Sequence, residues 1–226
     1  MMRWLALPLL LALSSGACAG TVWLSGAGTT LAVDVVNMRD ARFQGVVRQQ
    51  YDFSCGAASV ATLLTYHYDD PVGEREVMDG MLASADAERV VNEGFSMLEM
   101  KHFLATRGLD ADGFRAGLDA LAGTGIPAIA LIDTDGYRHF VVIQGVSSDE
   151  VLVGDPALGV RVYSRTEFKA IWNGLLFLVR DHVDQAKATF NRAEQWAVRE
   201  RVPYGLALQQ PTLDGFALSL PRSGDF

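Results

Sequence analysis

The sequence predicts one α+β domain, in which a helical N-terminal half packs on an antiparallel sheet formed by the C-terminal half. From Cys55 onward, apolar residues recur at the three- and four-residue spacing of an α-helix. After residue 125 they form short continuous runs separated by turns such as Asp133-Thr134-Asp135-Gly136, as in antiparallel strands. This segregation, in a chain of 226 residues, indicates an α+β architecture with one well-buried core.

Residues 1–19 are typical of a signal peptide that is removed on export. Arg3 supplies the positive charge, residues 4–13 form a short apolar run, and Ala17-Cys18-Ala19 fits a small-residue cleavage site. An uncleaved anchor is disfavoured, because an apolar run this short cannot span a bilayer. A lipid anchor on Cys18 is a weaker alternative, since the usual apolar residue three positions before it is absent. We therefore expect a cleaved signal peptide and a periplasmic protein.

Composition limits the partners of this protein. A net charge of −8 and a pI near 4.9 argue against nucleic acid or an anionic membrane surface as the main partner. The sequence has no Walker A motif, so we expect no ATP binding, and we expect no cofactor or metal.

The first half of the chain is predicted to be mainly helical. Residues 20–41 form an N-terminal lead-in with one or two short strands, and residues 42–48 continue as an extended segment. A helix runs from Cys55 to Asp69-Asp70-Pro71, because proline disfavours the helical conformation in the residue before it. A capping box of Ser96 and Glu99 begins a clear helix that Gly108 ends. Two shorter surface helices are predicted between them, at residues 74–83 and 87–93.

The second half is predicted to contain the sheet, followed by a peripheral C-terminal region. The expected strands, with one short helix at residues 166–172, span residues 126–132, 139–146, 151–154, 160–163 and 175–179. The main domain therefore covers residues 42–180. Residues 181–226 are expected to hold one helix over residues 183–201, then a proline-containing extended tail.

Cys55 is the candidate nucleophile. Removal of the signal peptide leaves it as the sole cysteine, so it cannot form an internal disulfide. At the start of a helix, unpaired N–H groups and the positive end of the helix dipole favour the reactive thiolate. Gly56, Ala57 and Ala58 keep the first turn narrow enough for a substrate backbone to approach. A buried structural cysteine would explain these small residues equally well, but not the polar residues before it.

His139 is the predicted base among four histidines. His67 lies twelve residues along the same helix as Cys55, about 18 Å away at 1.5 Å per residue. His102 falls on the polar face of its helix, and His182 follows the last strand without an orienting partner. His139 opens a buried strand directly after a turn, at the sheet rim where a side chain can face a cleft.

Asp155 is the predicted group that orients His139. It ends the strand that pairs back after the turn at residues 147–150, so the two side chains are expected to meet. The structural alternative is a turn aspartate before a proline. The competitors Asp133 and Asp135 lie in a hairpin turn and are expected to point to solvent.

A glutamine shortly before the nucleophile is the predicted oxyanion donor. The side-chain NH₂ of Gln49, six residues before Cys55, can converge with the cysteine backbone N–H on one oxygen. Spacing alone leaves Gln44 and Gln50 as alternatives.

These motifs together resemble the C39 peptidases, which are papain-like cysteine peptidases best known as the N-terminal domain of bacteriocin-exporting ABC transporters. The resemblance implies a papain-like fold over roughly residues 42–180 and cleavage after a Gly-Gly pair that ends a leader peptide. It implies catalytic roles for Cys55, His139 and Asp155, and it favours Gln49 as the oxyanion residue. The matching segments, in their expected order, are residues 49–58, 94–98, 136–142 and 154–156.

Two features differ from the transporter-fused members of that family. Ser54 stands directly before the cysteine, where many of those members have aspartate, and this chain has no ATPase or membrane domain. With its signal peptide, the chain resembles stand-alone exported C39 proteins, some of which accompany secretion systems for surface fibres such as functional amyloid.

We therefore expect an exported cysteine endopeptidase that cleaves a secreted protein or peptide and works with secretion-system components. One alternative is a cell-wall amidase or endopeptidase, which is disfavoured because no Asp-Cys-Ser-Gly sequence starts the nucleophile helix. The other is a catalytically silent C39-like module that binds a secretion partner. Retention of all four catalytic-type residues argues against this second alternative.

Overall fold

The computed structural model describes residues 21–26, 29–34 and 38–197, and the chain divides into two compact units after Ala41. The first unit contains an antiparallel hairpin of β1 (Thr21–Gly26) and β2 (Thr29–Asp34), where one or two strands were expected. A short helix, α1 (Met38–Arg42), spans the boundary between the units. The expected signal peptide and the tail over residues 202–226 lie outside the described residues.

The second unit begins with helices that agree closely with the sequence prediction. Those of its first half are α2 (Cys55–His67), α3 (Glu74–Leu82), α4 (Ala87–Glu93) and α5 (Met97–Thr106). The predicted capping box of α5 is present. The Ser96 hydroxyl accepts a backbone N–H from the first turn of the helix, and the Glu99 carboxylate accepts the Ser96 backbone N–H. Residues 42–48 differ from the prediction, because α1 ends at Arg42 and a turn follows in which Val46 N–H donates to Phe43 O.

The rest of the unit is a six-stranded antiparallel sheet with the order β3-β8-β4-β5-β6-β7. Its strands are β3 (Ala111–Arg115), β4 (Ala128–Thr134), β5 (Tyr137–Val146), β6 (Glu150–Asp155), β7 (Gly159–Ser164) and β8 (Trp172–Val179). Helices α6 (Leu118–Thr124) and α7 (Arg165–Ile171) connect strands. Segregated helices and an antiparallel sheet confirm the predicted α+β class.

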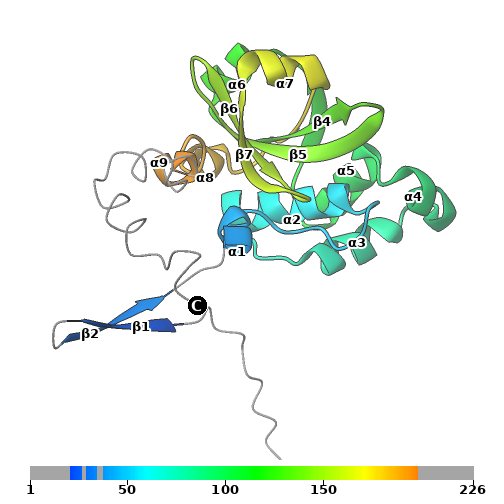
Figure 1. Cartoon of the computed structure of the whole chain (residues 1–226). Helices are drawn as coiled ribbons and strands as arrows, with labels where there is room; N and C mark the ends of the chain where they lie inside the picture. The colour runs from blue at the N-terminus through cyan, green and yellow to red at the C-terminus, as the bar shows by residue number, and fades with distance from the viewer. Residues whose placement is uncertain (1–20, 27–28, 35–37, 198–226) are drawn as a thin grey trace, which may run out of the picture. The chain divides into compact units, whose positions relative to one another are not determined.

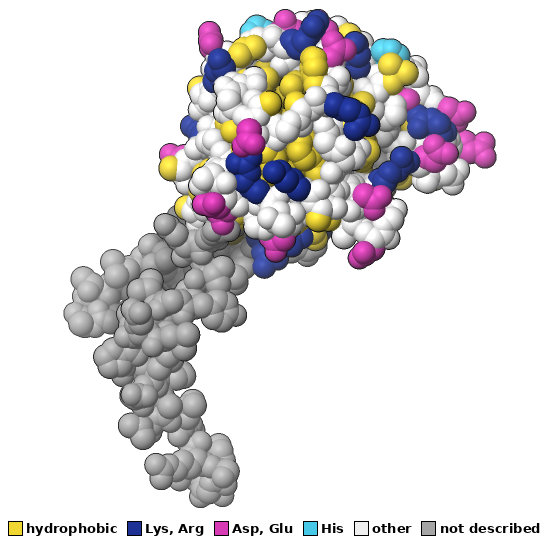
Figure 2. All heavy atoms as spheres, turned by 90° about the horizontal axis from the view of Figure 1, so that it is seen from above, with side chains coloured by type: hydrophobic (Ala, Val, Ile, Leu, Met, Phe, Trp, Pro, Cys, Tyr) yellow, Lys and Arg dark blue, Asp and Glu magenta, His cyan; other side chains and the backbone are white. Residues whose placement is uncertain are grey.

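Helices cover both faces of the sheet, as Figure 1 shows, with α2, α3 and α5 on one side and α6 and α7 on the other. Alternate residues of β5 serve the two cores: Phe140 and Val142 pack with α2, whereas Val141 and Ile143 pack with α6 and α7. This explains why β5 reads as a continuous apolar run. On the face seen in Figure 2, acidic and basic side chains are interspersed around apolar ones.

Helix α2 lies in the centre of the helical half, and eleven of its thirteen residues are buried. Small residues at its start allow this close packing. A Cβ added at Gly56 would lie 2.7 Å from the Met100 Cε atom and 3.3 Å from the Phe95 Cβ atom. The first turn therefore has tertiary as well as catalytic reasons to be narrow.

The β4–β5 turn fixes the register that brings His139 to the sheet rim. Asp135 and Gly136 both have positive φ, at 54° and 86°, as a two-residue hairpin turn requires. Ile132 then pairs with His139. On the other side of β5, Val142 pairs with Gly154, which places Asp155 near the start of β5.

Three further parts of the chain differ from the sequence prediction. Strand β3 and helix α6 were not expected: β3 includes Asp112 and Gly113, residue types that are rare in strands, and it forms by pairing with β8. The single helix predicted over residues 183–201 is wrong. Two short helices, α8 (Val183–Lys187) and α9 (Ala193–Trp196), occur instead.

The break between α8 and α9 has a tertiary cause. Asn191 adopts a positive φ of 59°, its N–H donates to Gln144 O, and its side chain donates to Val146 O. Phe190 is buried in the core at the same point. These contacts with β5 interrupt the helix. Among the described residues, none of the helices has the length and apolar character needed to cross a membrane.

Candidate active site

Cys55 is the first residue of α2 and lies at the wall of a cleft. Its side chain is a free thiol that is only 7% exposed. The cleft has a volume of about 620 Å³ and lies between the α4–α5 connection and the β4–β5 hairpin. Apolar side chains that line it include Phe95, Met97, Leu131 and Leu175. A polypeptide segment laid in this cleft would pass the thiol.

His139 and Asp155 form a buried pair. The His139 Nε2 atom lies 2.8 Å from Asp155 Oδ1, and the two side chains are 6% and 3% exposed. The same carboxylate oxygen accepts the backbone N–H groups of Ala157 and Leu158, at 2.8 and 3.1 Å. The turn after β6 therefore holds the carboxylate still, and the carboxylate fixes the orientation of the imidazole ring.

The other ring nitrogen of His139 is available for the thiol. Nδ1 is buried and has no hydrogen-bond partner of full geometry among the described residues. Burial lowers the pKa of His139, but hydrogen bonds to Asp155 and Cys55 and their negative charges outweigh burial and raise the pKa to about 9. The imidazole is thus protonated at neutral pH.

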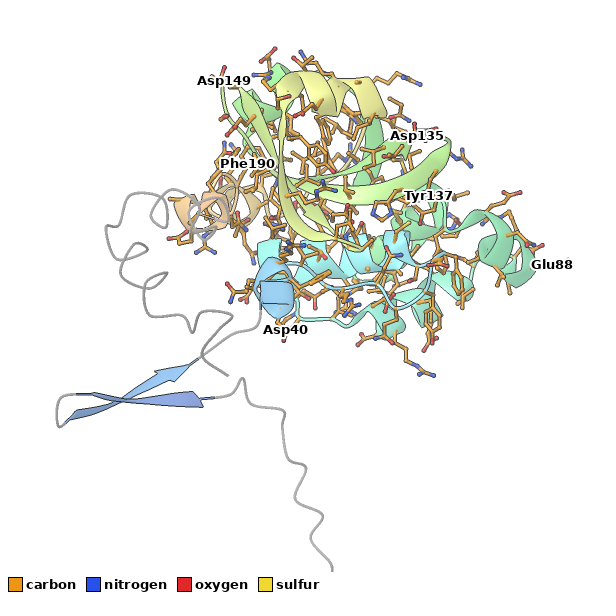
Figure 3. All side chains as sticks on the ribbon, in the orientation of Figure 1. Asp40, Glu88, Asp135, Tyr137, Asp149 and Phe190 are labelled. Atoms are coloured by element: carbon orange, nitrogen blue, oxygen red, sulfur yellow. The ribbon has the colours of Figure 1, made fainter. Side chains whose placement is uncertain are left out.

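Asp155 remains ionised within this pair. Burial raises the pKa of its carboxyl group, but hydrogen bonds from His139 and from the two backbone N–H groups lower it below its usual value. The two aspartates that compete with Asp155 for the role of orienting His139 lie at the β4–β5 turn. Asp133 is exposed and accepts the Gly136 N–H at 2.8 Å, and Asp135 lies exposed at the tip of the hairpin (Figure 3).

Gln49 is tied by its backbone to the turn that follows Asp155. Its backbone N–H donates to Pro156 O at 3.0 Å, which ties it to the turn after Asp155. Its side-chain Nε2 donates to Tyr51 O at 3.0 Å. Gln44 and Gln50 are both exposed, and the Gln50 N–H points instead to the carboxylate of Glu74.

Tyr137 is a site residue that the sequence interpretation missed. Its ring stacks on the His139 ring with centroids 5.8 Å apart, and its hydroxyl lies 3.4 Å from Asp52 O (Figure 3). Burial and then the negative charges of Cys55, Asp52 and Asp155 raise the pKa of Tyr137, against a hydrogen bond from Gln49. Period-two alternation places Tyr137 on the same face of β5 as His139, so the sequence did contain a signal for it.

The other three histidines lie away from the cleft. His67 is buried and its Nδ1 atom lies 2.8 Å from Thr189 Oγ1. Burial, with the nearby Arg192 charge, lowers the pKa of His67 to about 4. His102 and His182 are exposed. None of the three lines the cleft.

Comparison with known sequences supports a peptidase. The sequence model of the peptidase C39 family matches residues 44–184. A protein named probable functional amyloid protease FapD, from Pseudomonas aeruginosa, is 45% identical over 181 residues, which is 79% of this chain and 80% of that protein. Its namesake from Pseudomonas fluorescens is 43% identical over 180 residues, with the same shares covered.

Comparison with solved structures confirms the papain-like fold of this family. The peptidase domain of the Streptococcus transporter ComA superposes with a TM-score of 0.51 at 19% identity, covering 59% of this chain and 96% of that domain. A double glycine motif protease from an AMS/PCAT transporter, solved in complex with its leader peptide, gives a TM-score of 0.50 at 26% identity. The superposition covers 59% of this chain and 89% of that protein.

Proposed function

Because this chain belongs to the peptidase C39 family and is a cysteine peptidase, we propose that it cleaves an exported protein substrate with a catalytic set of Cys55, His139, Asp155 and Gln49. The observation that carries this proposal is the position of the His139 ring. One nitrogen is held by the Asp155 carboxylate at 2.8 Å, the other is buried without a hydrogen-bond partner among the described residues, and Cys55 lines the cleft.

The proposed reaction proceeds through a thioester. The Cys55 thiolate attacks the scissile carbonyl, and the Gln49 amide with the Cys55 backbone N–H stabilises the resulting oxyanion. The C–N bond breaks as the His139 imidazolium gives its proton to the leaving amine. Water then attacks the thioester, His139 takes a proton from it, and the acid product leaves as the thiolate reforms. Asp155 keeps the imidazole oriented in both steps.

The proposed substrate is a component of a fibre-secretion system, and the proposed location is the periplasm. The relatives named functional amyloid proteases support the substrate class, and the N-terminal sequence motif supports export. The cleft has apolar walls with Arg89, Glu93 and Arg138 among its residues, so an extended segment with apolar side chains fits it best.

Alkylation of Cys55 by iodoacetamide tests the proposed chemistry. We expect rapid labelling of the wild type near neutral pH, no labelling of Cys55→Ala, and slow labelling of His139→Ala, because loss of the imidazolium removes the charge that stabilises the thiolate. His102→Ala, which changes an exposed histidine, is the matched control and should react like the wild type. Equal rates in His139→Ala and the wild type would refute activation by His139.

Comparative N-terminal proteomics of exported proteins tests the substrate. Strains that carry the wild type or Cys55→Ser should differ in new N-termini on fibre-system proteins, which only the wild type produces. Two outcomes would favour other functions. Full complementation of a deletion strain by Cys55→Ala would indicate a silent binding module, and release of soluble fragments from purified peptidoglycan would indicate a cell-wall enzyme.

A further inference from the structure

We infer that Glu74 is a positioning residue of this peptidase: its buried carboxylate holds the loop 50–54, which joins the proposed oxyanion donor to the nucleophile. The inference rests on the proposed function, since it concerns how Gln49 is placed relative to Cys55. Glu74 lies twenty residues beyond Ser54, at the start of α3, and no catalytic role was expected for it from the sequence.

The carboxylate of Glu74 is directed inward to this loop. Glu74 is only 4% exposed, and its Oε1 atom lies 2.5 Å from Ser54 Oγ and 2.9 Å from the Gln50 backbone nitrogen. Burial of a carboxylate is unfavourable unless donors satisfy it, so these two hydrogen bonds give the group its reason to be there. Both donors belong to the short segment between Gln49 and Cys55.

Ser54 transmits this constraint to Tyr51. The Ser54 side chain is fully buried, and its Oγ atom accepts the Tyr51 N–H at 3.2 Å. A hydroxyl has one proton, and Ser54 Oγ lies near both Glu74 Oε1 and Tyr51 O, the latter at 2.8 Å. The 2.5 Å separation is typical of a charge-assisted bond to a carboxylate, and we assign the proton to the Glu74 bond.

Tyr51 completes the connection to the oxyanion donor. Its carbonyl oxygen accepts the Gln49 Nε2 group at 3.0 Å and the Ser54 N–H at 3.2 Å. Tyr51 itself is 46% exposed, and its ring stacks on Phe53 with centroids 5.5 Å apart. The Gln49 amide is therefore positioned by a backbone carbonyl whose own place depends on Ser54 and, through Ser54, on Glu74.

This arrangement predicts a selective defect when Glu74 is lost. The bond between His139 and Asp155 involves no atom of the loop, so activation of the thiol should survive. Stabilisation of an oxyanion should not, because the Gln49 amide would lose its fixed position. Acylation of Cys55 passes through an oxyanion, whereas alkylation by iodoacetamide, in which sulfur displaces iodide, does not.

The experiment compares these two reactions at Cys55 in the chain without residues 1–19, where Cys55 is the sole cysteine. The acylation probe is the p-nitrophenyl ester of N-acetylglycine, from which the thiolate displaces p-nitrophenolate to form a thioester. For Glu74→Ala we expect the acylation rate constant to fall by about tenfold to a hundredfold, less than the loss of an oxyanion donor outright. The alkylation rate constant should stay within about twofold of the wild-type value, because the substitution leaves the thiol and its imidazole neighbour in place.

Further variants separate positioning from folding. Glu76→Ala changes an exposed carboxylate on the same helix, paired with Arg107 at 3.1 Å, and should leave both rate constants unchanged. Glu74→Gln keeps an acceptor oxygen and should retain more acylation than Glu74→Ala. Ser54→Ala should reproduce the defect, and its combination with Glu74→Ala should be no worse than the more impaired single variant, because both act through one connection.

Each outcome decides the inference. Acylation in Glu74→Ala equal to that in Glu76→Ala would overturn it, and so would equal losses of acylation and alkylation, which would mean that Glu74 only maintains the fold. If Glu74→Ala does not fold, Glu74→Gln and Ser54→Ala provide the same comparison. Failure of the proposed function looks different, because alkylation would then not depend on His139 at all.

Discussion

At the scale of single residues, the site depends on one imidazole ring held between a carboxylate and a thiol. Asp155 is itself fixed by two backbone N–H groups, so its geometry does not depend on solvent. Burial of the pair strengthens their interaction, because little water competes for the carboxylate. The raised pKa of His139 follows from this arrangement rather than from the histidine alone.

The first prediction concerns Asp155→Asn. Burial alone lowers the pKa of His139, and the Asp155 charge and hydrogen bond are the main factors that raise it to about 9. Removal of the charge should lower the His139 pKa by about 1–3 units, the usual effect of one close opposite charge. NMR titration of the imidazole protons measures this. Asp133→Asn, in the exposed hairpin turn, is the control, and an unchanged His139 pKa in Asp155→Asn would contradict the prediction.

At the scale of elements, α2 connects the nucleophile at one end to a buried histidine at the other. Close packing at Gly56 presses its first turn against α5, and His67 in its last turn bonds to Thr189, directly after α8. The helix is therefore held at both ends by different parts of the chain. This agrees with the burial of eleven of its thirteen residues.

The second prediction is a pH-dependent loss of stability caused by His67. Its pKa is about 4 in the folded chain and about 6.5 when unfolded, so between these values the unfolded state binds more protons. The free energy of unfolding should therefore have its full value, as far as His67 is concerned, above about pH 6.5. It should fall as the pH drops toward 4, by about 3 kcal/mol in total at 1.36 kcal/mol per pKa unit.

Urea unfolding of His67→Gln at several pH values in this window measures the effect. Glutamine does not titrate and can still bond Thr189, so the loss of stability on acidification should be smaller in the variant than in the wild type. His102→Gln changes an exposed histidine and should follow the wild type. Parallel pH profiles for His67→Gln and the wild type would show that His67 is not the responsible group.

Local sequence predicted the features that neighbouring residues decide and missed those that depend on distant contacts. The Ser96–Glu99 capping box and the Asp135-Gly136 turn are decided within a few residues, and both occur as expected. Strand β3 was missed because its stability comes from pairing with β8, more than fifty residues later. The predicted single helix beyond residue 183 failed for the same kind of reason, since Asn191 bonds to β5.

At the scale of the whole molecule, the sheet separates two cores and the site lies at its rim. Both cores draw on alternate residues of β5, so the strand that presents His139 is packed on both faces. The cleft beside it is bordered by connections rather than by the centres of elements. Binding residues on loops that a rigid scaffold positions are the usual arrangement in enzymes.

The third prediction is that the second compact unit folds and reacts without the first. Every core residue and every candidate site residue that the structure describes lies after Ala41. A chain that begins at Arg42 should therefore keep a cooperative thermal transition and wild-type alkylation of Cys55. Circular dichroism and iodoacetamide labelling check this. Loss of the transition, or labelling as slow as in His139→Ala, would show that the first unit is needed.

The sequence by itself determined the class of fold, and its local patterns led to the proposed nucleophile and base. A helix start marks Cys55, a turn followed by an apolar run marks His139, and the strand that pairs back leads to Asp155. Only the tertiary structure tied the Gln49 backbone to the turn after β6 and brought the Glu74 carboxylate to the loop 50–54. Those bonds depend on where α3 and the turn after β6 meet the chain, and spacing along the sequence contains no information about such distant contacts.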